Sequence, residues 1–234
     1  YPALLFFVAL VVILLVVHKV DIIPSQIFAA LFYFENYYSV YFINYQENHL
    51  LYSTFKILWS LSIEEHYYLF YPLFLCLTYS RVRLHVFLSL LLLLVPLAFR
   101  LYYVDTLLEP KLFAKYNYSL THTRIDGIFY GSFLAVLLFR HQASEKIFKF
   151  LTNNIVLVLS LVLLAVTFIY RDNAFRETWR YTIQGIALAP VITWAIYVDK
   201  PMIDRVFLSN KVFIYISRFS YSIYLFHWLA IPLA

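Results

Sequence analysis

The sequence predicts an all-α fold, a polytopic bundle of transmembrane helices. Of the 234 residues, 63% are hydrophobic and only 13% are charged, and the mean hydropathy is +0.76. A soluble domain is nearer half apolar and a quarter charged. Apolar runs recur along the whole length, and a run such as LSLLLLLVPLAF shows no two-residue alternation. These observations favour a helical membrane protein over a soluble one.

We expect about seven spanning segments, each centred on one apolar run. They cover approximately 2–17, 61–79, 84–102, 125–140, 154–170, 181–198 and 213–233. An eighth candidate, 27–42, is interrupted by Glu35 and Asn36 and is rich in tyrosine. We interpret it as an interfacial or re-entrant element. Together the segments predict a single integral-membrane domain over 1–234.

The basic residues indicate an orientation in the membrane. Three short loops are dense in Lys and Arg, and the positive-inside rule makes them cytoplasmic: 80–83, 140–153 and 199–212. The longer connections are then outside: 18–60, 103–124 and 171–180. Because the basic residues are spread over these loops, the net charge of +5 needs no nucleic acid partner.

The two ends of the chain indicate a piece of a longer protein. The only methionine is Met202, and the chain opens directly in an apolar run with no basic segment before it. It closes in the middle of another apolar segment. We therefore expect the domain to be truncated at both ends, and a signal peptide is a poor interpretation.

Polar residues enter the apolar pattern first in WSLSIEEHYYLFYP, 59–72. Ser62 and Glu65 fit a capping box, which predicts a helix start and explains one glutamate. Glu64 and His66 are left beside it. Ionisable groups at membrane depth are costly and are functional by default, so we favour a functional role.

The second motif is THTRIDGIFYGSFLA, 121–135. Arg124 and Asp126 are two residues apart and do not face each other on a helix, so each needs another partner. Glu64 or Glu65 is a candidate partner for Arg124. Small residues recur at four-residue steps, which indicates close helix packing: Gly127, Gly131 and Ala135.

The third motif is ISRFSYSIYLFHWLAIP, 216–232, where polar residues recur at three- and four-residue steps. They are Ser217, Ser220, Tyr221, Tyr224 and His227. This spacing predicts one polar face on an otherwise apolar helix. The stripe is either a set of inter-helix hydrogen bonds, with His227 satisfied by a neighbour, or part of a functional site.

Other polar residues carry weaker signals. We interpret Arg100 and the charges of 171–180 as boundary anchors. Five histidines lie at segment ends or in loops, where we expect solvated or interfacial side chains: His18, His49, His85, His122 and His141. A single cysteine, Cys76, excludes an internal disulfide, and no cluster has metal-ligand spacing, so no metal site is expected.

At these three motifs the sequence resembles the membrane acyltransferase 3 family. WSLSIEEHYYLFYPL resembles its W-S-L-S-x-E-E-Q-F-Y-L-x-x-P signature, TRIDGIFYGSFLAVLL its R-[LI]-D-x-[LI]-x-x-G segment, and ISRFSYSIYLFHWLAI its G-x-x-S-Y-x-x-Y-L-x-H-x segment. Order and spacing agree over essentially the whole chain. His66 stands where the family usually has Gln, and Leu229 stands where Pro is common.

The resemblance implies a fold of roughly ten spans in a bacterial inner membrane. It implies transfer of an acyl group, expected to be acetyl, from cytoplasmic acyl-CoA to a hydroxyl of a cell-surface glycan or lipid-linked sugar. Acyl-CoA would be a donor substrate, with no bound cofactor. The family's proposed catalytic histidine would lie upstream of Tyr1, outside this piece.

The resemblance also implies roles for residues at the matching positions, in a chain surrounded by membrane lipid. The catalytic candidates are Glu64, Glu65 and His227. The substrate-binding candidates are Trp59, Ser62, Arg124, Asp126, Ser220 and Tyr224.

Two other functions fit the same polar residues. Intramembrane Glu, Arg, Asp and His also occur in proton-coupled transporters, although the sequence shows no inverted repeat and no pair of Gly/Pro-broken helices. A non-catalytic remnant that lacks the upstream base is the third interpretation.

Overall fold

The predicted all-α class is confirmed by a computed structural model of the chain. The structure describes residues 2–42, 50–140, 145–199 and 209–233, and within these ranges every regular element is helical. Two of the histidines discussed above, His49 and His141, lie outside the described residues.

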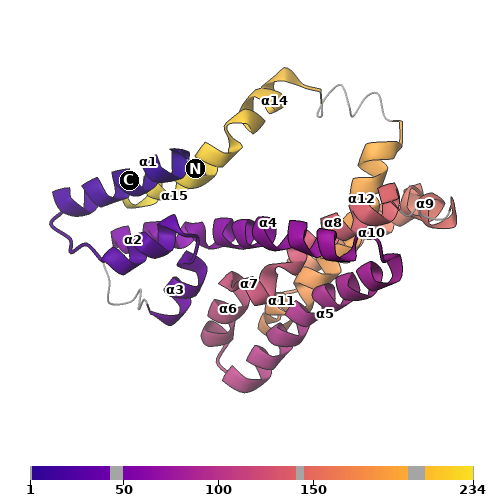
Figure 1. Cartoon of the computed structure of the whole chain (residues 1–234), viewed down its shortest axis with the longest axis horizontal. Helices are drawn as coiled ribbons and strands as arrows, with labels where there is room; N and C mark the ends of the chain where they lie inside the picture. Colours follow the sequence, from indigo (N-terminus) through magenta and orange to yellow (C-terminus); the bar gives the residue numbers. More distant parts are fainter. Residues whose placement is uncertain (1, 43–49, 141–144, 200–208, 234) are drawn as a thin grey trace. The chain divides into compact units, whose positions relative to one another are not determined.

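The chain divides into two compact units. The first comprises Tyr1–Glu65 and Asp199–Ala234, and the second comprises His66–Val198. Helix α4 (Leu58–Thr78) begins in the first unit and continues in the second (Figure 1). The single domain expected over 1–234 stays a prediction, and each unit is described by itself.

The first unit consists of short helices from both ends of the chain. They are α1 (Pro2–Val17), α2 (Pro24–Leu31), α3 (Glu35–Tyr41), the 3₁₀ helix η1 (Leu50–Ile57), the start of α4, α14 (Lys211–Arg218) and α15 (Ser220–Leu233). The expected segment 27–42 is thus not one continuous helix. The chain turns at Tyr33, whose φ of 60° lies in the left-handed region and interrupts the helical hydrogen bonding.

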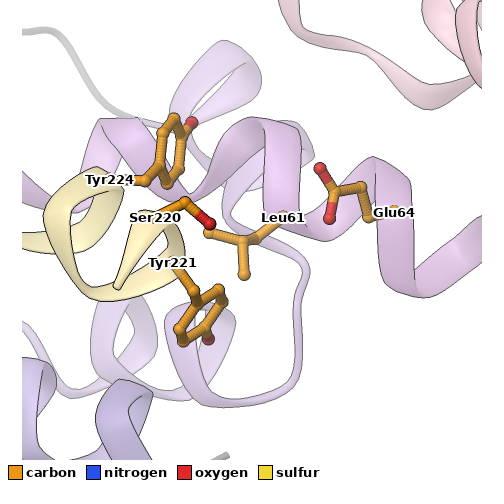
Figure 2. A pocket seen from close by; sticks show the side chains of 5 residues that line it. All are labelled: Leu61, Glu64, Ser220, Tyr221 and Tyr224. Atoms are coloured by element: carbon orange, nitrogen blue, oxygen red, sulfur yellow. The ribbon is translucent and has the colours of Figure 1, made fainter. Parts of the chain in front are cut away.

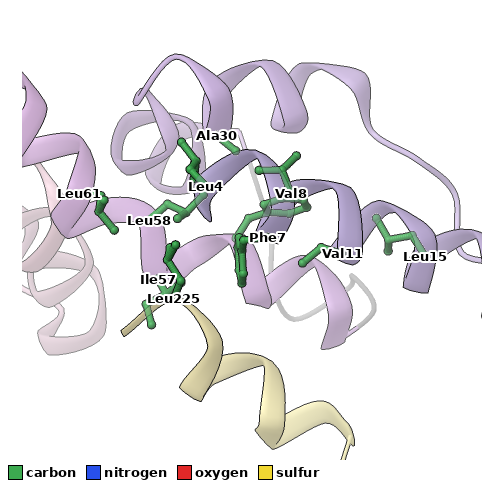
Figure 3. Packing of buried hydrophobic residues seen from close by; sticks show 11 residues of the cluster. Leu4, Phe7, Val8, Val11, Leu15, Ala30, Ile57, Leu58, Leu61 and Leu225 are labelled. Carbon is green, nitrogen blue, oxygen red and sulfur yellow. The ribbon is translucent and has the colours of Figure 1, made fainter. Parts of the chain in front are cut away.

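The core of the first unit forms around one face of α1 (Figure 3). Leu4, Phe7, Val8, Val11 and Leu15 are buried there, at the spacing that places side chains on one side of a helix. Their partners in the cluster include Ala30, Phe55, Leu58, Leu61 and Leu225. The Phe7 ring meets Phe55 edge-on at 6.4 Å between centroids. This packing joins α15 to η1 and the start of α4.

The second unit consists of the helices that follow α4. They are α5 (Val82–Leu107), α6 (Pro110–Ser119), α7 (Thr121–Arg124), α8 (Asp126–Ala135), the π-helical turn η2 (Val136–Arg140), α9 (Glu145–Leu151), α10 (Asn154–Ile169), α11 (Asn173–Glu177) and α12 (Trp179–Tyr197). Two starts are set by side-chain caps. Asn153 accepts from the Ile155 amide, and Asp172 accepts from the Phe175 amide, both at 2.7 Å.

Helices α10 and α12 pack with polar groups between them and apolar groups outside. Thr167 and Ser160 are buried on α10, and the Gln184 amide of α12 donates to the Thr167 hydroxyl at 2.9 Å. The exposed side of α10 carries Ile155, Leu159, Val162 and Val166. This arrangement is the reverse of a water-soluble helix, whose apolar face is the buried one.

One described helix is long and apolar enough by itself to cross a bilayer, namely Val82–Leu107, which has 26 residues and contains an 18-residue stretch with a mean hydropathy of 2.2. The pair α9 and α10 meets this criterion only together and is bent by 54° between the two helices. The predicted count of seven spans is therefore not confirmed. The segment expected at 213–233, for example, is divided at Phe219 into α14 and α15.

His85 departs from the expected interfacial position. It is 1% exposed, and its Nδ1 lies 2.7 Å from the Thr78 hydroxyl, which donates to the Phe74 carbonyl. The histidine thus fixes the turn between α4 and α5. His122 is half-buried with its Nε2 3.1 Å from the Tyr103 hydroxyl, and burial lowers its pKa.

The expected close packing along Gly127, Gly131 and Ala135 is wrong within the described residues. All three are exposed, and a Cβ added at either glycine would meet nothing within 4 Å. Close approach occurs instead at Gly185 of α12, where an added Cβ would overlap the Tyr130 ring of α8 and lie 2.7 Å from its Cγ. Gly185 therefore permits the contact between α8 and α12.

Gly185→Ala is expected to destabilise the protein by about 1–3 kcal/mol, because the new methyl group must displace a ring near its attachment point. Gly131→Ala is the matched control. Its methyl group would enter open space, and helix propensity favours alanine by roughly 0.5–1 kcal/mol. Thermal unfolding of both variants in one detergent measures the difference, and equal midpoints would contradict this account of Gly185.

Candidate active site

The first unit contains a cavity between the start of α4 and the start of α15. Its volume is about 350 Å³, and its described lining consists of Leu61, Glu64, Ser220, Tyr221 and Tyr224. Figure 2 shows that α4 supplies Leu61 and Glu64 and that α15 supplies the other three. The cavity therefore combines residues from the first and third sequence motifs, which lie more than 150 positions apart.

The α15 side of the cavity depends on a break in the chain. Helix α14 ends at Arg218, so Ser220 begins α15 and its side chain enters the cavity. The same break corrects the predicted stripe. Ser217 belongs to α14 and donates to its own helix, to the Ile214 carbonyl at 2.8 Å. The polar face is therefore shorter than the continuous stripe expected from the spacing.

Tyr224 holds the two helices together at the cavity wall. Its hydroxyl donates to the Ile57 carbonyl at 2.9 Å and accepts from the Ser60 hydroxyl. The next residue, Leu225, is fully buried in the core cluster. This side of the cavity is thus fixed by hydrogen bonds and by apolar packing together.

His227 lies one turn beyond Tyr224, outside the described lining of the cavity. It is exposed, and its Nδ1 lies 2.7 Å from the Tyr224 carbonyl oxygen. Because a carbonyl only accepts, Nδ1 must carry the proton and donate it in this bond. In this tautomer a neutral ring presents Nε2 as a proton acceptor, as a general base requires.

The remaining predicted residues of this unit have different surroundings. Glu65 and Trp59 are partly buried and are not among the described cavity residues. Ser62 is fully buried and donates to the Leu58 carbonyl at 3.0 Å. The predicted capping box is therefore wrong, because α4 begins at Leu58 and Ser62 already lies inside the helix.

The second unit contains a buried ion pair that includes Asp126. The carboxylate of Asp126 accepts two hydrogen bonds from the Arg100 guanidinium, at 3.0 and 2.8 Å. Arg100 also donates to the Thr123 carbonyl at 2.6 Å and to the Thr182 hydroxyl at 2.9 Å. Asp126 thus has the separate partner that its spacing from Arg124 predicted.

Arg100 is a residue whose importance sequence reasoning missed. It was interpreted as a boundary anchor, but its side chain is fully buried. The helix extends to Leu107, five residues beyond the predicted end of the span, and this places Arg100 well inside it. The available signal was an arginine within a long apolar segment, which is functional by default.

Arg124 lies over the ring of Tyr181, with 3.7 Å between the guanidinium carbon and the ring centroid. Tyr118 is a second ring at 5.7 Å. Burial lowers the pKa of Arg124, although an arginine remains charged in proteins. Arg124 belongs to the second unit and Glu64 and Glu65 to the first, so the suggested pairing between them stays a prediction.

The second half of the first motif faces α7 and α8. His66, at the position where the related motif has Gln, has its Nδ1 2.7 Å from the Thr121 hydroxyl. The Tyr67 hydroxyl meets that of Ser132, and the Tyr67 ring stacks on Tyr71 at 4.9 Å. The motif therefore divides, with Glu64 in the first unit and His66 onward in the second.

Comparison with known proteins agrees with the motif resemblance. An acyltransferase-domain family matches residues 1–234. The O-acetyltransferase OatA of Staphylococcus aureus strain NCTC 8325 is 27% identical over 244 residues, which cover 97% of this chain and 38% of OatA. A protein of S. aureus strain COL, named provisionally as an O-acetyltransferase, is 27% identical over 222 residues, which cover 89% of this chain and 35% of that protein. No solved structure matches.

The described elements of the chain are all helical, and the cavity of the first unit is lined by a carboxylate, a serine and two tyrosines. The chain belongs to the acyltransferase family whose domain matches it throughout. It spans a little over a third of the length of the curated relatives it matches.

Proposed function

We propose that the chain is part of a membrane O-acyltransferase. The enzyme moves an acyl group, in the first place acetyl, from acyl-CoA to a hydroxyl of a cell-surface glycan or lipid-linked sugar. Family membership and relatives named as O-acetyltransferases support the reaction class. The observation that carries the proposal is the cavity lined by Glu64, Ser220 and Tyr224.

We place the enzyme in a bacterial inner membrane as a multi-pass protein of about seven spans in this chain. Helix α5 supports at least one span. The α10–α12 pair supports a lipid environment, because its polar groups face each other and large apolar side chains are exposed. In water such an exposed apolar face would promote aggregation.

The reaction needs a positioned hydroxyl and a proton acceptor. The acceptor oxygen attacks the thioester carbonyl carbon, the carbon–sulfur bond breaks, and the thiolate of CoA leaves. The hydroxyl proton passes through a general base and ends on the thiol. A hydroxyl is a weak nucleophile near neutral pH, so the carboxylate of Glu64 would accept its hydrogen bond and orient it in the cavity.

The other predicted residues of the first unit would assist at this site. Ser220 and Tyr224 would line the acceptor's path, with Glu65 and Trp59 nearby on α4. Nε2 of His227 would accept a proton. Ser62 would act through the backbone of α4, since its hydroxyl is already used inside that helix. In the second unit, Arg124, which shares the Tyr181 ring with Arg100, would bind a charged substrate group.

The test is acyl transfer by the full-length protein in membrane vesicles with radiolabelled acetyl-CoA. We expect label in a base-labile ester on the glycan or lipid fraction, dependent on the protein. Proton-driven uptake of a solute without esterified product would instead support a transporter. Absence of both activities in a well-expressed full-length protein would favour a non-catalytic remnant.

A further inference from the structure

Three arginines of the second unit converge on one tyrosine ring. The guanidinium carbons of Arg124, Arg180 and Arg100 lie 3.7, 4.9 and 5.4 Å from the centroid of Tyr181. The residues come from α5, α7 and the first turn of α12, so the cluster is built by the fold and not by one run of sequence. Cations over an aromatic face are attracted by the ring, but they repel one another.

Two carboxylates of the second unit contact the cluster. Asp126 neutralises Arg100 through a bidentate contact that is fully buried. The Glu177 carboxylate accepts a hydrogen bond from the Tyr181 hydroxyl at 3.0 Å. Its negative charge therefore acts on the arginines by way of Tyr181.

Arg180 is the member of the cluster that can receive a ligand. It is partly exposed, and its Nη2 donates to the Tyr181 oxygen at 3.1 Å. Its Nε is buried and has no hydrogen-bond partner among the described residues. A guanidinium has five donors in a fixed fork, and a buried donor without a partner costs about 1–3 kcal/mol. An anion is the partner that such a fork fits best.

The cluster also lies at a defined end of the second unit. Arg100 lies in the C-terminal third of α5, whereas Arg81 and Arg83 are at its N-terminal end. The proposed topology puts the arginine-rich loop 80–83 in the cytoplasm and the segment 171–180 outside. The ligand of Arg180 would therefore come from the side where the glycan acceptor is expected.

We propose that Arg180, Arg124 and Tyr181 form an anion-binding site that holds a carboxylate or phosphate group of the acceptor. Arg180 supplies the fork, Arg124 supplies a second guanidinium beside the same ring, and Tyr181 contacts both. The inference rests on the proposed function, because it names a charged glycan as the acceptor class. It assigns the site a role in binding and not in the chemical step.

The experiment compares the full-length protein with Arg180→Gln in neutral lipid nanodiscs. The probes are a uronic-acid oligosaccharide, its carboxyl-reduced neutral form, and the neutral form carrying one phosphate ester. Two readouts are taken, the KM for acyl transfer and the Kd of the fluorescently labelled oligosaccharide without acyl-CoA. Arg171→Gln, which removes an exposed arginine from the same connection, is the matched control.

We expect wild type to prefer a charged probe over the neutral one by roughly tenfold, the equivalent of one charge-assisted hydrogen bond. Arg180→Gln should reduce this ratio to about one, Arg180→Lys should retain part of it, and Arg171→Gln should leave it unchanged. Whichever charged probe is preferred shows whether the site binds a carboxylate or a phosphate group. Arg180→Lys keeps the test decisive if the glutamine variant does not fold.

The proposal would be overturned if wild type and Arg180→Gln had the same preference for the charged over the neutral probe. It would also be overturned if Arg171→Gln lost this preference to the same extent as Arg180→Gln, because the preference would then reflect general charge attraction only. If no probe is acylated by wild type or by any variant, the proposed function fails for these acceptors. The Kd values then test the anion-binding site by themselves. A tighter Kd for the charged probe that Arg180→Gln abolishes would still support the anion site. Identical Kd values would remove it.

Discussion

Glu64→Gln in the full-length protein is expected to lower the rate of acyl transfer by roughly hundredfold or more, with normal expression and membrane insertion. Glutamine has the same size but no charge, so it loses the strong hydrogen bond that a carboxylate accepts from an attacking hydroxyl. Glu64 lines the cavity, its side chain is exposed, and among the described residues it makes no hydrogen bond that holds the fold. The loss should therefore appear in the rate and not in stability.

The measurement is the initial rate with radiolabelled acetyl-CoA in vesicles, normalised to the amount of inserted protein. Glu109→Gln is the matched control, since Glu109 is an exposed carboxylate of the second unit at the start of α6. Glu65→Gln separates the two adjacent glutamates, because Glu65 is not in the described lining. Wild-type rates in both Glu64→Gln and Glu65→Gln would exclude the carboxylates from the mechanism.

Local sequence signals located most helices well. The segment predicted at 154–170 is Asn154–Ile169, and that predicted at 2–17 is Pro2–Val17. In the first case an asparagine cap and a continuous apolar run act over a few residues, so the sequence contains the necessary information. The polar faces of α4 and α15 were also recognisable, because side chains three and four positions apart share a helix face.

Local signals failed where a competing element or a distant partner decides the structure. Ser62 and Glu65 have the spacing of a capping box, but η1 precedes them and α4 starts four residues earlier. The break at Phe219 has no proline or glycine to announce it. Composition cannot show either event, because each depends on how η1, α4 and α15 pack in the first unit.

Arg100 shows the same limit for the site. Its carboxylate partner is 26 positions away and Thr182 is 82 positions away, so no helical spacing joins them. Sequence reasoning did show that Asp126 needed a partner other than Arg124, and the structure supplies it. The identity of that partner follows only from the packing of α5 against α8 and α12.

Breaking the Arg100–Asp126 pair is expected to destabilise the protein more than replacing both members. Arg100→Met or Asp126→Leu alone leaves one buried charge without its counter-ion and should cost about 3–5 kcal/mol. The double variant leaves no buried charge, so it should lose less than either single variant, although Thr182 and the Thr123 carbonyl lose their donor.

A double-mutant cycle from unfolding midpoints in one detergent measures this coupling. The control is the exposed ion pair of Glu145 and Lys149. Removing this pair by substitution should lower the free energy of unfolding by only about 0.3–0.5 kcal/mol, because water screens both charges. Additive losses at Arg100 and Asp126 would mean that the two residues stabilise the fold independently. A coupling that exceeds the control would show that Asp126 stabilises the fold through Arg100, and therefore through the packing of α5 against α8.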